Sequence, residues 1–153
     1  MSLLVGVEYC KMDAQGRFKI PVAIKKQLDI ASDNRFFVRH SIYDNNLELF
    51  TYEAFQQEVA YLQGNLNTYD PDSKKLYRRM IEGNMVEMDA FDRILVPDNL
   101  RQLAHLSKEI VLIGSGKYLE LWDSTIYKKT CEDNFDYKQA AKNLLSKAND
   151  HFE

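Results

Sequence analysis

The pattern of hydrophobic and polar residues predicts two β-hairpins, one in each half of the chain. Four short apolar runs have the β-branched and aromatic content that strands prefer: Phe36 to Arg39, Leu47 to Phe50, Ile110 to Ile113, and Tyr118 to Trp122. Asn45-Asn46 separates the first two runs, and Gly114-Ser115-Gly116 separates the last two. Because these residue types favour turns, each pair of runs is expected to form a hairpin.

Other segments have the periodicity of helices. Phe55, Val59 and Leu62 follow i, i+4, i+7 spacing. Asp70 followed by Pro71 has the order of an N-cap and a first helical residue. Three longer helices are therefore expected: Thr51 to about Leu66, Asp70 to about Ile81, and a terminal helix from Asp123 or Ser124 that breaks at residues 134–136.

One block of the sequence occurs twice. The block from Met12 to Pro21 is repeated from Met88 to Pro97, 76 positions further along. Both copies start with Met-Asp-Ala, have an Arg four positions after the Asp, and end with Pro. Such a period indicates one supersecondary unit used twice.

Each copy of the block has the chemistry of a tight turn. Asp13 and Gly16 stand at the first and fourth positions of a type I turn, and a left-handed Gly after such a turn is common in hairpins. The second copy has Asp89 and Asp92 at these positions, and Asp tolerates the left-handed region better than most residues. These four residues are expected to structure two turns, the first joining strands at Gly6 to Met12 and Arg17 to Ile20.

Pro21 and Pro97 suit the first turn of a helix, so each block is expected to lead into a short helix, the first ending near Asp29. Isolated hairpins are marginal in water, so the two units should pack around one core. The residues expected to point inward are Val7, Phe18, Ile20, Phe37, Leu49, Val86, Ile94, Val96, Leu112 and Leu121.

Composition excludes several classes of protein. The chain has 153 residues, a formal net charge of −3, three His and two Cys, and no apolar run long enough to span a membrane. The first residues do not have the pattern of a signal peptide, so secretion is not expected. No metal-ligand spacing is present, and Gly114 to Lys117 lacks the order of a phosphate loop. We therefore expect a cytoplasmic protein with no catalytic residues, no metal site and no cofactor.

Arg17 and Arg93 have two interpretations. Each guanidinium could present a fork of donors to DNA, or it could pair with the Asp four residues before it. Lys19, Lys25 and Lys26 could add phosphate contacts, but lysines on a short helix usually form only a solvated face. The residues alone leave both alternatives open.

The paired Asp-x-x-x-Arg blocks, each followed by an apolar residue, a Pro and a short helix, resemble the MraZ family of bacterial transcription regulators. A Leu-Glu-Leu-aromatic strand closes each half, at Leu47 to Phe50 and Leu119 to Trp122. The resemblance implies a mainly β fold with flanking helices, in which tandem SpoVT-AbrB-like β-β-α-β-β repeats form one pseudo-dimeric double-psi or swapped-hairpin barrel.

The same resemblance implies a function. It predicts a repressor that binds double-stranded DNA at promoter repeats, including its own promoter, in the division and cell-wall gene cluster. Arg17, Arg93, Lys19, Lys25 and Lys26 would contact the DNA. The protein would form a ring-shaped homo-oligomer and associate with the nucleoid, with no membrane partner.

The expected organisation is a first repeat at residues 5–52, connecting helices at 53–82, a second repeat at 83–125 and a helical tail at 126–153. The main alternative function is an antitoxin-like or structural interaction module whose tail helix binds a partner. An enzyme is the least favoured class, because no catalytic constellation is present.

Overall fold

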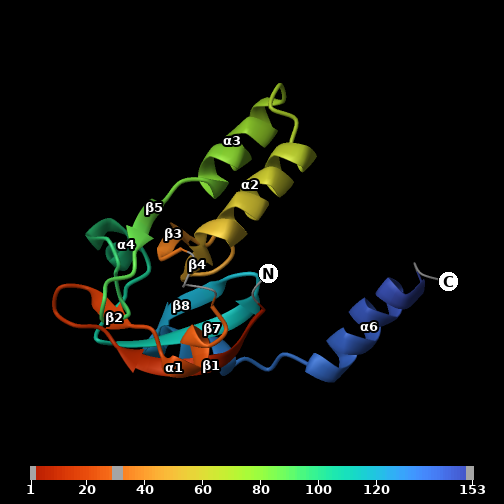
Figure 1. Cartoon of the computed structure of the whole chain (residues 1–153). Helices are drawn as coiled ribbons and strands as arrows, with labels where there is room; N and C mark the ends of the chain where they lie inside the picture. Colours follow the sequence, from red (N-terminus) through yellow and green to blue (C-terminus); the bar gives the residue numbers. More distant parts are fainter. Residues whose placement is uncertain (1–2, 29–32, 151–153) are drawn as a thin grey trace.

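Strands and helices alternate along the chain in two similar halves (Figure 1). The computed structural model describes residues 3–28 and 33–150. The strands are β1 (Leu4–Lys11), β2 (Arg17–Lys19), β3 (Arg35–His40), β4 (Leu47–Thr51), β5 (Asn84–Glu87), β6 (Arg93–Leu95), β7 (Glu109–Gly116) and β8 (Leu119–Asp123). The helices are α1 (Val22–Lys25), α2 (Tyr52–Asn65), α3 (Pro71–Met80), α4 (Asp98–Leu103), α5 (Ser124–Cys131) and α6 (Tyr137–Asp150).

The two halves exchange strands. Six strands form one antiparallel sheet in the order β1-β7-β8-β4-β3-β5, so that β1 of the first half pairs with β7 of the second, and β5 of the second pairs with β3 of the first. The hairpins β3–β4 and β7–β8 form as expected and meet through β4 and β8. Exchanging the two halves reproduces the same strand order, so the sheet has pseudo-two-fold symmetry.

The prediction that the strands at Gly6 to Met12 and Arg17 to Ile20 pair as a hairpin is wrong. Only one bridge, Met12 with Phe18, joins these segments, and β2 pairs instead with β6 in a separate two-stranded sheet. The fold is therefore mixed β with helices, as the AbrB-like resemblance implies. Among the residues described here, however, the strands do not close into one continuous barrel.

One hydrophobic core joins both halves and contains most of the residues expected to be inward. Phe18, Ile20, Ile94 and Leu112 are almost completely buried, and burying side chains of this size contributes roughly 1.5–3 kcal/mol each. Val7 is the exception, since 47% of its surface is exposed. The opposite face of β1 is buried instead, with Leu4 and Met12 in the core.

Capping residues fix where the helices begin. The side chains of Thr51, Asp70 and Asp123 accept hydrogen bonds from backbone N–H groups at the starts of α2, α3 and α5. α1 ends at Lys25, earlier than expected, and Asp29 lies outside the described residues. The expected turn at Gly114 to Gly116 is also wrong, because these residues extend β7 and pair with β1.

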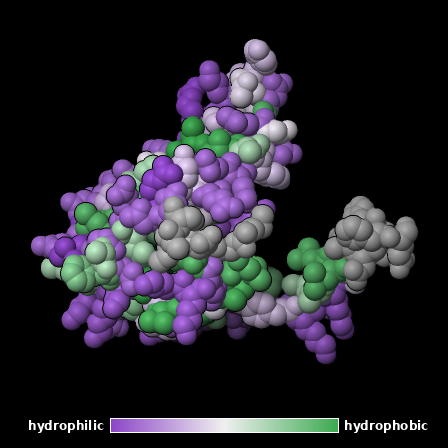
Figure 2. Space-filling model, viewed as in Figure 1, coloured by the Kyte–Doolittle hydropathy of each residue, from purple (hydrophilic) through white to green (hydrophobic). Residues whose placement is uncertain are grey.

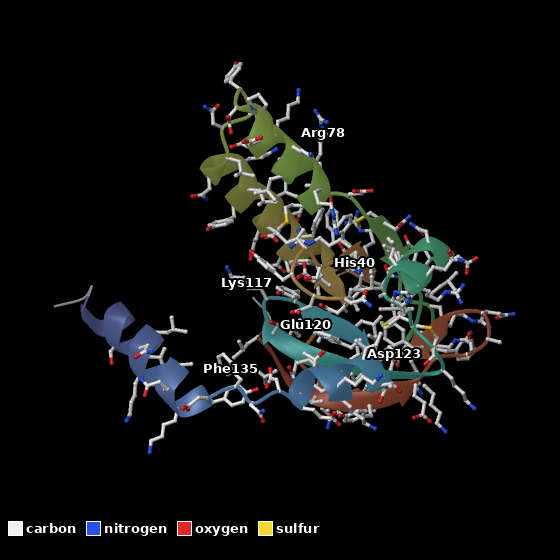
Figure 3. The ribbon with its side chains drawn as sticks, turned by 180° about the vertical axis from the view of Figure 1, so that it is seen from behind. His40, Arg78, Lys117, Glu120, Asp123 and Phe135 are labelled. Carbon is white, nitrogen blue, oxygen red and sulfur yellow. The ribbon has the colours of Figure 1, made fainter. Side chains whose placement is uncertain are left out.

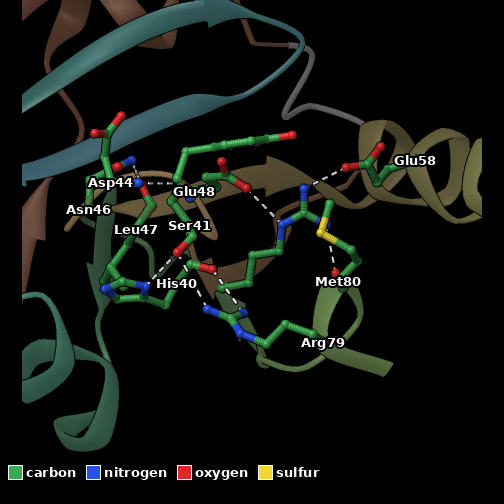
Figure 4. Close-up of polar contacts among 11 residues, drawn as sticks. His40, Ser41, Asp44, Asn46, Leu47, Glu48, Glu58, Arg79 and Met80 are labelled. Carbon is green, nitrogen blue, oxygen red and sulfur yellow. Dashed lines mark hydrogen bonds and ion pairs between the residues drawn. The ribbon is translucent and has the colours of Figure 1, made fainter. Parts of the chain in front are cut away.

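A buried arginine joins α2 and α3 to the sheet (Figure 4). Arg39 on β3 donates to Glu48 on β4 at 2.8 Å, to Glu58 on α2 at 2.5 Å and to the Met80 carbonyl oxygen at 2.6 Å. Arg79 adds a hydrogen bond to the His40 carbonyl oxygen at 3.0 Å. The middle of α2 and the end of α3 are thereby attached to the sheet.

The tail stands away from the rest of the chain (Figure 1). It breaks between α5 and α6 where expected, and its last residues, 151–153, lie outside the described part. Leu144 and Leu145 are exposed, and Figure 2 shows hydrophobic atoms on one side of α6 and hydrophilic atoms on the other. The helix therefore presents an apolar side to solvent.

Candidate nucleic-acid interface

The β2–β6 ribbon gathers three cationic side chains on its outward face. Arg17 lies opposite Leu95, and Lys19 lies opposite Arg93, while Phe18 and Ile94 between them are buried. Directly opposed residues in an antiparallel pair point to the same side, so the two arginines and Lys19 share the exposed face. Residues from both repeats thus form one surface.

The first turn leads into β2 and is built around Asp13. The Asp13 carboxylate accepts hydrogen bonds from the backbone N–H groups of Gln15 and Arg17, both at 2.9 Å. The Gly16 N–H donates to the Asp13 carbonyl oxygen at 3.0 Å. Gly16 has a φ of 92°, a conformation that costs a glycine little.

The second turn repeats this geometry without a glycine. The Asp89 carboxylate accepts from the backbone N–H groups of Phe91 at 2.8 Å and Arg93 at 2.9 Å. Asp92 occupies the left-handed position with a φ of 62°. The backbone hydrogen bonds from Arg17 and Arg93 lower the pKa of Asp13 and of Asp89 below the usual value of 3.8.

Each arginine pairs with the aspartate of its own turn. The Nε–Oδ2 distance is 3.1 Å for Arg17 and Asp13, and 2.9 Å for Arg93 and Asp89. Arg17 also donates to the Gln15 side chain, whereas Arg93 lies over the Phe91 ring. Because each aspartate holds Nε, the pairing orients the guanidinium. The Nη1 of Arg17, beside the Nη2 that Gln15 holds, and the outer edge of Arg93 remain able to meet a ligand. The two interpretations of these arginines are therefore compatible.

The three lysines differ in their surroundings. Lys19 lies on the ribbon, and Lys26 is exposed at the end of α1. Lys25 pairs with Asp92 of the other repeat at 2.7 Å. Asp92 does not pair with Arg93, because the Lys25 side chain occupies that carboxylate and Arg93 pairs with Asp89.

Carboxylates pair with most of the cations around the ribbon. Four ion pairs lie there: Arg17 with Asp13, Arg93 with Asp89, Lys25 with Asp92, and Arg101 with Asp98. Lys19 lies on the ribbon, and Lys26 and Lys108 are exposed beside it. Arg101 was not singled out from the sequence, although it stands 76 positions after Lys25. Other cations lie elsewhere, since Figure 3 shows Arg78 on α3 and Lys117 at the β7–β8 turn, away from the end that holds β2 and α4.

Other kinds of site have little basis in the described residues. They contain no group of three or more His, Cys, Asp or Glu side chains placed to hold a metal ion. Burial raises the pKa of the Cys10 thiol to about 11, which makes it a poor nucleophile. Within the part described, no helix is both long and apolar enough to cross a membrane.

The architecture defines a class of protein, in which two AbrB-like units within one chain exchange strands and present two matched turns on one ribbon. A family model described as "MraZ protein, putative antitoxin-like" matches residues 80–147. The transcriptional regulator MraZ of Flavobacterium psychrophilum is 30% identical over 152 residues, covering 98% of this chain and 96% of that protein. The transcriptional regulator MraZ of Christiangramia forsetii is 34% identical, with 100% and 98% covered.

A third relative provides a similar match. The transcriptional regulator MraZ of Mycoplasmoides gallisepticum is 34% identical over 128 residues, covering 79% of this chain and 89% of that protein. Identity of this extent over nearly the full length assigns the family. The chain belongs to the MraZ family.

Proposed function

We propose that this chain is a sequence-specific DNA-binding transcriptional regulator that represses the division and cell-wall gene cluster, including its own promoter. The relatives are named as transcriptional regulators and not as enzymes, which supports regulation over catalysis. A protein with this role acts in the cytoplasm and associates with the nucleoid.

The observation that carries the proposal is the outward face of the β2–β6 ribbon. A two-stranded β-ribbon fits the major groove of B-DNA, where an arginine fork matches the O6 and N7 acceptors of guanine. Arg17 and Arg93 are the proposed base-reading residues, because their turn aspartates orient both guanidinium groups. Lys19 and Lys26 are proposed to contact phosphates, whereas Lys25 is already neutralised by Asp92 and is assigned no phosphate.

We also propose that the protein assembles into a closed ring. The formal charge of −3, and the ion pairs that neutralise most cations of the ribbon, give a single chain little attraction for DNA. A ring repeats the same weak surface, and avidity can raise affinity by about 10²–10⁴ without a new contact. Exposed apolar residues on β1 and α6 provide surface for such self-association.

A second candidate function rests on α6. An antitoxin-like module would bind a protein partner through this helix, whose Leu144 and Leu145 are exposed. The description of the matching family model includes the words "putative antitoxin-like". In that case the wild-type chain would not shift promoter DNA, whereas a DNA-binding regulator would.

Titration of labelled duplex DNA from upstream of the protein's own gene tests the proposed function. We expect Arg17→Ala and Arg93→Ala each to weaken binding by about 1–3 kcal/mol if the lost contact is to a base. The melting temperature should change little, because surface ion pairs contribute only about 0–1 kcal/mol.

Arg78→Ala is the matched control, since it removes the same charge from an exposed position on α3. Its affinity for the promoter should equal that of the wild-type chain. Unchanged affinity in the Arg17→Ala, Arg93→Ala double variant would eliminate the ribbon as the reading surface.

A further inference from the structure

Lys25 and Arg101 are equivalent residues of the two repeats. They stand 76 positions apart, in the last turns of the equivalent helices α1 and α4. Each lies against the turn of the other repeat, because the halves exchange strands. The backbone contacts are matched too, since the Ile20 N–H donates to the Asp92 carbonyl at 2.8 Å and the Val96 N–H to the Gly16 carbonyl at 2.9 Å.

The two cations meet different chemistry. Lys25 finds a carboxylate, Asp92, at the left-handed position of the second turn. In the first turn this position is Gly16, and Arg101 packs against it. A Cβ added to Gly16 would lie 2.5 Å from the Cζ and Nε atoms of Arg101. The second turn thus has a carboxylate, Asp92, that neutralises Lys25. The first turn has Gly16 at the equivalent position, so it has no carboxylate there for Arg101.

The donors of Arg101 are only partly used. Its Nε is buried and has no hydrogen-bond partner among the residues that the structure describes. Its terminal nitrogen pairs with Asp98 of its own helix, whose side chain is 80% exposed. The ion pair of Arg101 with Asp98 is therefore open to solvent on the side of the carboxylate.

A cavity adjoins Arg101 beside the first turn. Its volume is about 480 Å³, and its lining includes Asp13, Ala14, Ser107 and Lys108 as well as Arg101. The Asp13 carboxylate is already held by Arg17, and the Ser107 hydroxyl donates to Asp123 at 2.6 Å. Lys108 is exposed, and its carbonyl oxygen accepts from the Met12 N–H at 2.7 Å, which fixes its backbone next to the turn.

We propose that Arg101 and Lys108 form a binding site for a DNA backbone phosphate beside the first turn, an inference that rests on the proposed DNA binding. The Arg101 side chain is 23% exposed, and Arg101 and Lys108 line the same open cavity. A guanidinium and an ammonium on one cavity have the chemistry of a phosphate site. The second turn has no such site, because Asp92 neutralises Lys25. The two pseudo-symmetric turns therefore bind DNA unequally, because only the first turn has a site for an additional phosphate.

The salt dependence of DNA binding tests this site. A lost phosphate contact weakens binding to all sequences alike and reduces the slope of log K against log[salt] by about 1. The full-length chain is titrated with its own upstream duplex and with a scrambled duplex, over roughly 50–200 mM salt. We expect Arg101→Gln to lower the magnitude of the slope by about 1 on both duplexes, and Lys108→Gln, at an exposed position, to lower it in the same direction.

The second repeat provides matched controls. Lys25→Gln should leave the slope unchanged, whereas Asp92→Gly should increase it by releasing Lys25. Adding Lys25→Gln to Asp92→Gly should then remove that increase. These variants leave Arg101 intact, so they remain informative if Arg101→Gln lowers the melting temperature.

The outcomes separate this site from the proposed function. A wild-type chain that binds neither duplex would overturn both. Wild-type binding together with unchanged slopes in Arg101→Gln and Lys108→Gln would overturn only the phosphate site. A loss of slope in Lys25→Gln equal to that in Arg101→Gln would overturn the proposed inequality of the turns.

Discussion

Gly16 and Asp92 occupy the same backbone conformation in the two repeats but contribute differently to stability. Both have positive φ angles, 92° and 62°, which are strained for a residue with a side chain. Asp92 offsets part of that strain through its ion pair with Lys25. Gly16 has no strain to offset, and its missing side chain makes room for Arg101.

Substitutions at these two positions should therefore differ in effect. Gly16→Ala should lower the free energy of unfolding by about 1–2 kcal/mol from backbone strain, and further because the new Cβ collides with Arg101. Asp92→Gly removes strain together with a partly exposed ion pair worth about 0–1 kcal/mol, so it should change stability by less than about 1 kcal/mol. Urea unfolding measures both, and an equal loss in the two variants would contradict this account.

Among the secondary-structure elements, the α2–α3 hairpin depends on one buried ion network. Arg39 is 3% exposed and Glu48 is 6% exposed, so each needs the other's charge. Glu58 lies nearer to solvent, with 20% of its side chain exposed. The network therefore holds α2 and the end of α3 at one point on the sheet.

Arg39→Met should destabilise the fold by about 3–5 kcal/mol, because it leaves Glu48 buried without a partner. The double variant Arg39→Met, Glu48→Leu should recover much of that loss, since it removes both charges. Glu58→Gln is the milder control, because water can solvate that position. Thermal unfolding measures all three, and a double variant as unstable as Arg39→Met would refute the argument.

The local elements could be read from the sequence, because their signals are local. Thr51, Asp70 and Asp123 cap helices that begin where expected, and Asn45-Asn46 lies in the β3–β4 connection. The sequence could not show which face of β1 is buried. Val5, Val7 and Tyr9 form a regular apolar alternation, yet these side chains are exposed, and Leu4 on the other face is buried. A period-two pattern shows that one face is apolar, but it does not show what covers that face.

Strand partners and the full site were also beyond local reasoning. The sequence of residues 12–21 does not indicate that β2 pairs with β6 and not with β1, its neighbour along the chain. Lys25 and Arg101 become significant only when the exchanged strands bring each to the opposite turn. The DNA-contacting roles and the division of the chain at residues 52, 82 and 125 stay predictions.

At the scale of the whole molecule, the β1 apolar strip, formed by Val5, Val7 and Tyr9, lies on an edge strand. These side chains are 51%, 47% and 55% exposed. Edge strands with apolar side chains favour association with another chain. The strip is the surface on which we expect a second copy to pack in the proposed ring.

Light scattering of the full chain should give a mass larger than a dimer of the 17.9 kDa protein at micromolar concentration. Val5→Asp together with Val7→Asp should shift the protein to smaller species, because a charge in an apolar contact is costly. Val22→Asp, on the exposed part of α1, is the control and should leave the mass unchanged. A wild-type mass near 17.9 kDa would rule out the ring.

The strand exchange also governs how the chain folds during synthesis. β1 is synthesised before the other described strands, but its hydrogen-bonding partner β7 begins only at Glu109. Long-range pairing of this kind slows folding and leaves strand edges open in the meantime. The nascent first repeat has neither β5 nor β6 to pair with until the helical hairpin between the repeats has been made. The edges of β1 and β3 are therefore the part of the newborn chain that we expect a chaperone to cover.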